Sequence, residues 1–165
     1  MTIYFSHGKE SGPWGRKITA LAEIARRKGI RVESIDYRDL PDPDDRARRL
    51  VEACRGESEP IVLVGSSMGG YVSAAAAGAI KPTGLFLMAP AFFLPGYCRQ
   101  EIALHGAKTV IVHGWRDDIV PPDNSIRVAR QNRSELHLID DGHQLLESLP
   151  LIALIFSEFL DSLAV

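Results

Sequence analysis

The chain has little cysteine, no long hydrophobic run and no excess of charge of either sign. Its 165 residues include 2 cysteines, Cys54 and Cys98, far apart and without metal-type spacing, so we expect free thiols and no disulfide framework. No apolar stretch approaches the roughly 18 residues that a membrane span needs. The first residues lack the basic start and apolar core of a signal peptide, so we expect a cytoplasmic protein.

The charge balance is not that of a protein that binds nucleic acids or anionic membranes. The formal net charge is −2, the pI is about 6.2, and the basic residues are scattered. Two short basic runs, residues 26–28 and 46–49, are interpreted as solvated helix faces. We therefore expect no nucleic acid and no membrane as partner, and the sequence does not indicate an oligomeric state.

What the chain does have is an alternation of strand-like and helix-like segments from end to end. Several strand candidates are near-continuous apolar runs, as expected when both faces of a sheet are covered. The predicted strands are residues 2–6, 31–36, 60–65, 84–89, 109–113 and 135–139, and the predicted helices are residues 14–28, 44–55, 68–80, 97–105, 123–131 and 144–163. This order predicts one α/β domain over residues 1–165, with a doubly wound, mostly parallel sheet in three layers.

The most informative motif follows the third predicted strand. Residues 65–69 read Gly-Ser-Ser-Met-Gly between an apolar run and an alanine-rich helix. This GxSxG pattern predicts a strand, a sharp turn and a helix, with the hydroxyl of Ser67 exposed on the turn as a candidate nucleophile. Ser66 is interpreted as a buried turn hydroxyl.

A serine nucleophile needs a base, and the base needs a group that orients it. The strand at residues 109–113 is followed by a polar loop with the adjacent carboxylates Asp117 and Asp118, either of which could hold an imidazole. The next strand is followed by Gly142-His143, which makes His143 the candidate base. His137 alternates with leucines inside that strand and is interpreted as a surface or core histidine.

Together these motifs resemble the α/β-hydrolase family of serine hydrolases. The matching features are the GxSxG elbow at Ser67, an HGxxDxxVP pattern at residues 113–121, a terminal Gly142-His143 and an N-terminal His7-Gly8. Their order, Ser then Asp then His, is the order of this family, and the resemblance covers almost the whole chain. Since the predicted strand before His7-Gly8 is the first one, we expect the family's first two antiparallel strands to be absent, as in the compact group that includes retinoblastoma-binding-protein-9-like and related bacterial esterases.

The resemblance implies a minimal α/β-hydrolase fold of about six strands and a Ser67, His143, Asp117 triad. Asp117 is preferred over Asp118 because the HGxxD pattern fixes its position. The oxyanion hole would use the backbone N–H groups of Met68 and Lys9, although Glu10 or the Gly8 amide could face the site instead. The implied reaction is hydrolysis of a small ester or thioester acyl substrate through an acyl-enzyme, without a cofactor.

Specificity depends on what covers the elbow. In this family a cap domain often follows the strand that ends here at residue 89, but the segment before the next strand is far shorter than the roughly 50 residues of a small domain. We therefore expect no cap. The apolar segment at residues 91–97 could line the acyl side through Phe92 and Phe93, with Trp115 and Ile119 as neighbours; plain core packing of both phenylalanines is the alternative.

Other chemistries fit less well. The histidines and aspartates of residues 113–118 and 140–143 could converge on a metal, but the chain has no HExxH or paired cysteine spacing, and we expect no metal. The lysine of a phosphate-binding GxxxxGK[ST] loop is absent. The alternative function is a catalytically silent protein of this fold that holds a partner in the Ser67 cleft, since fold does not establish function.

Overall fold

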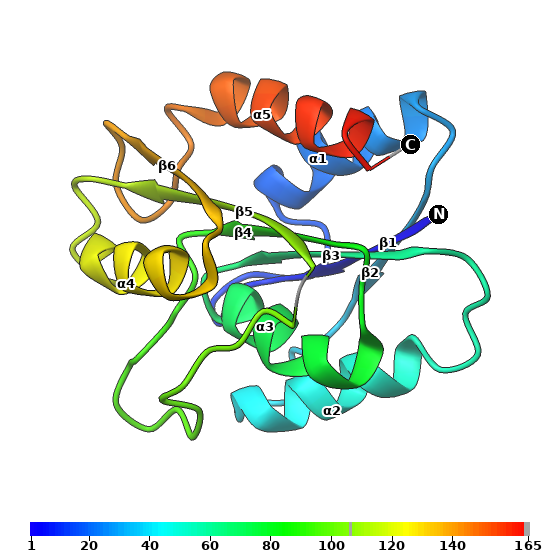
Figure 1. Cartoon of the computed structure of the whole chain (residues 1–165), viewed down its shortest axis with the longest axis horizontal. Coiled ribbons are helices and arrows are strands. Elements are labelled where there is room, and N and C mark those ends of the chain that lie inside the picture. Colours follow the sequence, from blue (N-terminus) through cyan, green and yellow to red (C-terminus); the bar gives the residue numbers. More distant parts are fainter. Residues whose placement is uncertain (106, 164–165) are drawn as a thin grey trace.

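Six parallel strands form one sheet in the order β2-β1-β3-β4-β5-β6 (Figure 1). This computed structural model describes residues 1–105 and 107–163. The strands are β1 (Thr2–Ser6), β2 (Arg31–Ile35), β3 (Ile61–Ser66), β4 (Gly84–Met88), β5 (Lys108–Gly114) and β6 (Glu135–Ile139). The helices are α1 (Arg16–Arg27), α2 (Pro43–Ala53), α3 (Met68–Ile80), α4 (Pro122–Asn132) and α5 (Leu149–Asp161). The expected α/β fold class is confirmed, and the sheet is wholly rather than mostly parallel.

Helices cover both faces of the sheet, giving three layers. Helices α1 and α5 lie on one face, and α2, α3 and α4 lie on the other (Figure 1). Successive strand residues point to opposite faces, so Val62 and Val64 pack with α1 and α5 while Leu63 between them packs with α3. The central strands are apolar throughout because both of their faces are buried.

Local sequence explains where the helices begin. Asp42 caps α2, accepting hydrogen bonds from the backbone N–H groups of Asp44 and Asp45, and Pro43 occupies the first turn. Helix α3 is rich in alanine and almost wholly buried, which lets it lie close against the centre of the sheet.

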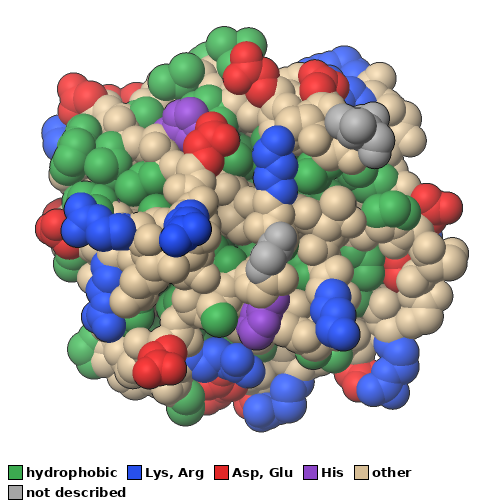
Figure 2. Space-filling model, in the orientation of Figure 1, with side chains coloured by type: hydrophobic (Ala, Val, Ile, Leu, Met, Phe, Trp, Pro, Cys, Tyr) green, Lys and Arg blue, Asp and Glu red, His purple; other side chains and the backbone are tan. Residues whose placement is uncertain are grey.

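On the outer surface, basic and acidic side chains are interspersed over the face shown in Figure 2.

Two of the expected helices differ in the structure. The described residues of segment 97–105 form no helix, and side chains from other elements bind their backbone groups. The N–H of Leu104 donates to Asn132 Oδ1, Asn132 Nδ2 donates to the carbonyl of Ile102, and the N–H of Arg99 donates to the Tyr71 hydroxyl. Helix α5 begins at Leu149 rather than at residue 144, since the preceding residues form the loop that carries His143.

The segment between β4 and β5 adds no cap over the sheet. Its described residues, 89–105 and 107, contain neither helix nor strand. The fold is thus a compact α/β-hydrolase fold without a lid, as expected. Within the described residues, no helix has the length and apolar character to span a membrane.

Parallel strands bring the loops that carry the candidate residues to one edge of the sheet. Strands β1, β3, β5 and β6 each end just before one of these loops, with Ser6 opposite Gly65 and Gly114 opposite Ile139 in the register. The carboxyl edge of the sheet therefore carries His7, Ser67, Asp117 and His143 together, where ligands bind in doubly wound folds.

Candidate active site

Ser67 lies on a strained turn between β3 and α3. Its φ of 55° and ψ of −120° fall in a region that non-glycine residues rarely adopt. The turn is held by its own backbone: the N–H of Ser67 donates to the Met88 carbonyl at 2.9 Å, and its carbonyl accepts the N–H of Gly70 at 2.9 Å and of Ala91 at 3.0 Å. These bonds fix the strained conformation and leave the hydroxyl partly exposed at the sheet edge.

The two glycines of the motif allow helix and strand to come into contact at this turn. A Cβ on Gly65 would lie 2.2 Å from the carbonyl oxygen of Gly69, and a Cβ on Gly69 would lie 1.9 Å from the carbonyl oxygen of Ser6. Both obstacles are backbone atoms, which cannot swing away as a side chain could. Glycine at these positions is therefore required by the close approach of α3 to β1 and β3.

The structure brings Ser67, His143 and Asp117 into one hydrogen-bonded chain. The Ser67 hydroxyl lies 2.9 Å from His143 Nε2, and His143 Nδ1 lies 2.7 Å from Asp117 Oδ2. The His143 side chain is 13% exposed and that of Asp117 is fully buried. Asp118, the neighbouring carboxylate, is exposed, so the carboxylate that contacts His143 is that of Asp117.

Asp117 is held as a carboxylate by four donors. Its Oδ1 accepts the backbone N–H of Ile119 and of Val120, and its Oδ2 accepts from His113 Nε2 as well as from His143. Burial by itself would raise the pKa of Asp117, but these hydrogen bonds outweigh it and hold the pKa well below its usual value. The group next to His143 is therefore an anion able to stabilise an imidazolium.

His113 and Ser125 extend this chain into the core. His113 is fully buried, and its Nε2–H reaches both Asp117 Oδ2 at 2.9 Å and the Val120 carbonyl at 3.0 Å. With its proton on Nε2, the ring accepts at Nδ1 from the Ser125 hydroxyl at 2.7 Å. His113 thus helps to fix the Asp117 oxygen that also contacts His143, as a histidine that shapes the loop.

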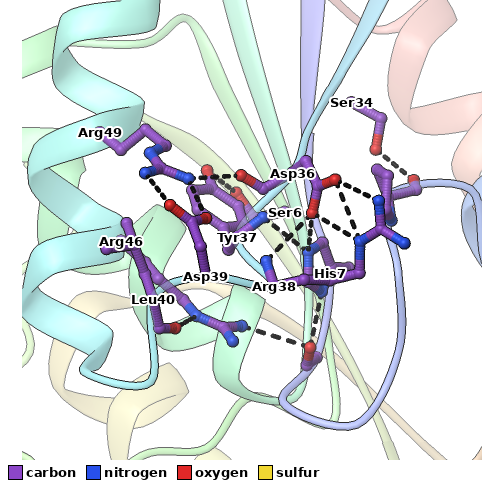
Figure 3. A network of polar contacts seen from close by, with 12 residues as sticks. Ser6, His7, Ser34, Asp36, Tyr37, Arg38, Asp39, Leu40, Arg46 and Arg49 are labelled. Atoms are coloured by element: carbon purple, nitrogen blue, oxygen red, sulfur yellow. Dashed lines mark hydrogen bonds and ion pairs between the residues drawn. The ribbon is translucent and has the colours of Figure 1, made fainter.

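His7 and Arg46 hold the loop that follows β1 (Figure 3). His7 Nδ1 donates to the Gly8 carbonyl at 2.7 Å, and its Nε2 accepts the N–H of Tyr37 at 3.0 Å. Arg46 donates to the same Gly8 carbonyl at 3.3 Å and to the Leu40 carbonyl at 2.6 Å. With the Gly8 carbonyl bound from two sides, the peptide that leads to Lys9 is fixed in orientation next to Ser67.

The structure corrects the interpretation of residues 46–49 as a solvated face. Arg46 is only 2% exposed, because it lies on the same side of α2 as Pro43 and Leu50 and stacks its guanidinium 5.6 Å from the centre of the Tyr37 ring. Its spacing of four residues from Leu50 was the signal in the sequence that could have shown this. Burial and hydrogen bonds to two carbonyls make it part of the site's support.

Met68 and Lys9, whose N–H groups are the expected oxyanion-hole donors, both line the cavity beside Ser67. Met68 opens α3 directly after Ser67, and a Cβ on Gly8 would lie 3.5 Å from the Ser67 Cβ, so the loop containing Lys9 adjoins the turn. Within the described chain, neither of these two N–H groups donates to another backbone or side-chain acceptor. The Gly8 N–H is likewise without such an acceptor, so that alternative stays open.

A cavity of about 600 Å³ opens above Ser67 and His143. Its apolar wall comes from the segment after β4 and from the loop after β5. Its lining includes the charged residues Lys9, Glu10, Arg16 and Lys17 and the apolar residues Leu94 and Ile119. The volume suits a small ligand.

Three of the four residues expected to line the substrate pocket do not line this cavity. Phe92 is fully buried and packs into the core on the α3 side of the sheet, so the core-packing alternative is right for this residue. Phe93 turns away and is covered by Arg127, whose guanidinium lies 4.3 Å from the ring centre. Trp115 is 56% exposed and lies outside the lining, whereas Ile119 is part of it.

Sequence reasoning missed Lys17 altogether. It is the second residue of α1, inside the helix predicted at residues 14–28, and no motif of the sequence distinguishes it from the other basic residues there. Burial lowers the pKa of Lys17 to about 8, although Asp141 and Asp117 act in the opposite direction. Among the described residues no cluster of three or more His, Cys, Asp and Glu side chains is arranged to hold a metal ion.

The sequence matches the family model described as the alpha/beta hydrolase family over residues 3–153. A solved structure from Xanthomonas campestris, described as belonging to the alpha/beta superfamily of hydrolases, is 35% identical, with 98% of each chain covered and a TM-score of 0.91. No curated protein sequence gave a significant match.

Two further solved structures share the fold at lower identity. Est1E from Butyrivibrio proteoclasticus, solved with ferulic acid bound, is 18% identical, with 99% of this chain and 89% of that chain covered and a TM-score of 0.82. A second Xanthomonas campestris protein, described as an α/β serine hydrolase without a lid, is 22% identical, with coverages of 95% and 79% and a TM-score of 0.72.

Proposed function

Since the chain belongs to the alpha/beta hydrolase family, we propose that it is a serine hydrolase that cleaves small esters or thioesters through an acyl-enzyme on Ser67. The observation that carries the proposal is the hydrogen-bonded chain from Ser67 through His143 to Asp117 at the floor of a cavity. A serine, an imidazole and a buried carboxylate in this order form a nucleophile, its base and the group that orients the base.

In the first step Ser67 Oγ attacks the acyl carbon. Its proton passes to His143 Nε2, which lies 2.9 Å away, and the imidazolium is stabilised by the Asp117 anion. The bond to the leaving group then breaks, and His143 returns the proton to the departing oxygen or sulfur. In the second step water attacks the acyl-enzyme with His143 again as base, releasing the acid and restoring the serine.

The negative charge on the carbonyl oxygen forms beside the N-terminus of α3. We assign the N–H groups of Met68 and Lys9 as its hydrogen-bond donors. Two features support the assignment: neither N–H is taken by another protein acceptor in the described chain, and the Lys9 peptide is fixed through the Gly8 carbonyl. A donor that is already oriented needs no reorganisation when the charge develops.

The cavity favours short acyl groups. Without a lid over Ser67, apolar contact comes only from the lining of the cavity, which includes Leu94 and Ile119. The part of a long acyl tail that extends beyond this lining into solvent would gain none of the roughly 0.8 kcal/mol that each buried methylene contributes. We therefore infer that acetyl and butyryl esters are better substrates than decanoyl or palmitoyl esters.

A fluorophosphonate probe and a p-nitrophenyl ester series test the proposal. Wild-type protein should be labelled on Ser67, located by peptide mass spectrometry, and should hydrolyse p-nitrophenyl butyrate. Ser67→Ala and His143→Ala should lose both activities while keeping the wild-type circular dichroism spectrum. His137→Ala is the matched control, because this histidine lies on β6 and bonds to Glu135 outside the site. A wild-type protein that takes up no probe and hydrolyses no ester would favour the catalytically silent alternative.

A further inference from the structure

The cavity has an asymmetric charge. The basic residues Lys9, Arg16 and Lys17 line it on the side of α1 and the loop after β1, and Glu10 is the one acidic side chain among its described lining residues. Lys9, Glu10 and Arg16 are exposed to solvent at this side, whereas Lys17 is largely withdrawn from it. The opposite wall is apolar. Water therefore screens the charge of Lys17 less than the charges of the three exposed residues, and a ligand in the cavity interacts with it more strongly.

Lys17 has no counter-ion of its own within the described part of the chain. No carboxylate lies within ion-pair distance of its ammonium group, and no hydrogen bond from it is formed. Asp117 and Asp141 are near enough to act on its charge, but their oxygens are used elsewhere. Asp141 accepts the backbone N–H of Gly142 and of Ser148, and Asp117 is bound by four donors.

The two carboxylates do not compensate for the burial of the lysine. Desolvation lowers the pKa of Lys17 despite their opposing effect, so the ammonium group is stabilised less here than in water. A poorly solvated cation that lines the same cavity as Ser67 is stabilised when an anion binds in that cavity. Such a group is more typical of a ligand site than of a structural ion pair.

The start of α1 adds to this preference. Gly15 occupies the N-cap without a side-chain hydrogen bond, and the first turn contains no acidic residue. Gly15, Arg16 and Lys17 all line the cavity, so the uncapped end of the helix adjoins the ligand space. The partial positive charge of a helix N-terminus favours an anion at this place.

Resting on the proposed function, we propose that Lys17 binds a carboxylate of the substrate, so that the enzyme selects esters or thioesters that carry a second, free carboxylate group. The ammonium donates a charge-assisted hydrogen bond to the carboxylate oxygen, and the ester carbonyl lies over Ser67. The carboxylate can belong to the acyl part or to the leaving group. Lys17 is in this assignment a specificity-determining residue and takes no part in bond breaking.

Two matched pairs of esters test the proposal on wild-type protein. For the acyl side, p-nitrophenyl hemiadipate is compared with its methyl ester; for the leaving-group side, 4-butyryloxybenzoate is compared with its methyl ester. Each kcat/KM is divided by the rate of hydroxide hydrolysis of the same compound, which removes the intrinsic reactivity. One pair should favour the charged member by roughly 10- to 100-fold, the size of a charge-assisted hydrogen bond in a partly buried site.

Variants then assign the preference to Lys17. Lys17→Met should bring the charged-to-neutral ratio close to 1, and Lys17→Arg should keep part of it. Lys28→Met removes the same charge at the C-cap of α1, from a surface ion pair with Asp161, and should leave the ratio at its wild-type value. A preference that survives Lys17→Met would overturn the assignment, as would wild-type protein that hydrolyses both members of both pairs equally.

Binding without turnover separates this proposal from the proposed function. Adipate and its neutral diamide are titrated by calorimetry into Ser67→Ala, and adipate should bind at least 10-fold more tightly, a difference that Lys17→Met in the same background removes. If Ser67→Ala binds adipate but a fluorophosphonate does not label the wild-type protein, the role of Lys17 is supported and the serine hydrolase is refuted. If the wild-type protein is labelled and hydrolyses esters, but Ser67→Ala binds adipate and its diamide equally, the role of Lys17 alone is refuted.

Discussion

Replacing Asp117 by Asn should abolish catalysis, because the amide stabilises the tautomer of His143 that carries its proton on Nε2. In the structure Oδ1 accepts the backbone N–H of Ile119 and Val120, and Oδ2 accepts from His143 Nδ1 and His113 Nε2. An amide offers one oxygen and one NH2 group in place of the two oxygens. Backbone N–H groups cannot be reversed, whereas an imidazole can move its proton, so the NH2 group turns towards the two rings.

The consequence for the nucleophile follows from this orientation. Facing an NH2 group, His143 Nδ1 must accept, its proton moves to Nε2, and Nε2 can no longer take the proton of Ser67. We expect kcat to fall by about 10⁴-fold, about 5.5 kcal/mol of transition-state stabilisation. His113 must shift its proton in the same way, which leaves the Val120 carbonyl without its donor at a cost of about 1–3 kcal/mol in the free energy of unfolding.

The assay is kcat and KM for p-nitrophenyl butyrate, with urea unfolding measured on the same preparations. Asp118→Asn is the matched control, because it makes the same chemical change at an exposed position one residue away, and we expect its kcat to stay within about threefold of wild type. A variant Asp117→Asn that keeps more than a tenth of the wild-type kcat, or a larger loss in Asp118→Asn, would refute the reasoning.

The difference in unfolding free energy between wild type and Asp117→Asn should also depend on pH. Hydrogen bonds hold the pKa of Asp117 in the folded state below the value of about 3.9 that an unfolded aspartate has. A carboxylate with a depressed pKa contributes stability that is complete above the unfolded pKa and is lost as the pH falls below it. The difference in unfolding free energy between wild type and Asp117→Asn should therefore be constant from pH 5 to 7 and shrink below about pH 4.

Three further substitutions have distinct expected outcomes. Gly69→Ala places a Cβ 1.9 Å from the Ser6 carbonyl oxygen and should abolish probe labelling and lower the unfolding free energy by about 3 kcal/mol or more, whereas Gly12→Ala, with its nearest obstacle at 3.9 Å, should do neither. Phe92→Ala should lower the free energy of unfolding in urea by about 3–5 kcal/mol, as expected of a fully buried ring. An unchanged free energy would contradict its place in the core and favour a substrate-lining role. Lys17→Met should be more stable than wild type at pH 7 by about 3 kcal/mol, because the pKa near 8 in the folded state lies below the unfolded value of about 10.4. Between about pH 8 and 10.4 the wild type loses this penalty, and the two melting curves should converge.

How much the sequence could predict depends on how local each feature is. The strand order along the chain, the elbow at Ser67 and the loops that follow β5 and β6 were expected, since apolar runs, glycines and turn residues act on neighbouring backbone. Helix ends were less accurate, and the helix expected at residues 97–105 is absent. Asn132 and Tyr71, remote in sequence, bind backbone groups of this segment, and the Leu104 N–H that a helix would use donates to Asn132.

The α/β architecture and the residue types at the carboxyl edge of the sheet follow from local sequence, because strand periodicity and the glycines of the elbow are set by neighbouring residues. Three features instead depend on the folded chain: which of two adjacent carboxylates contacts His143, the place of Phe92 in the core, and the burial of Arg46 against the Gly8 carbonyl. The position of Lys17 in the cavity is a fourth. Each of these depends on contacts between segments that lie far apart in the chain, and a local pattern carries no information on which of its faces another segment will cover.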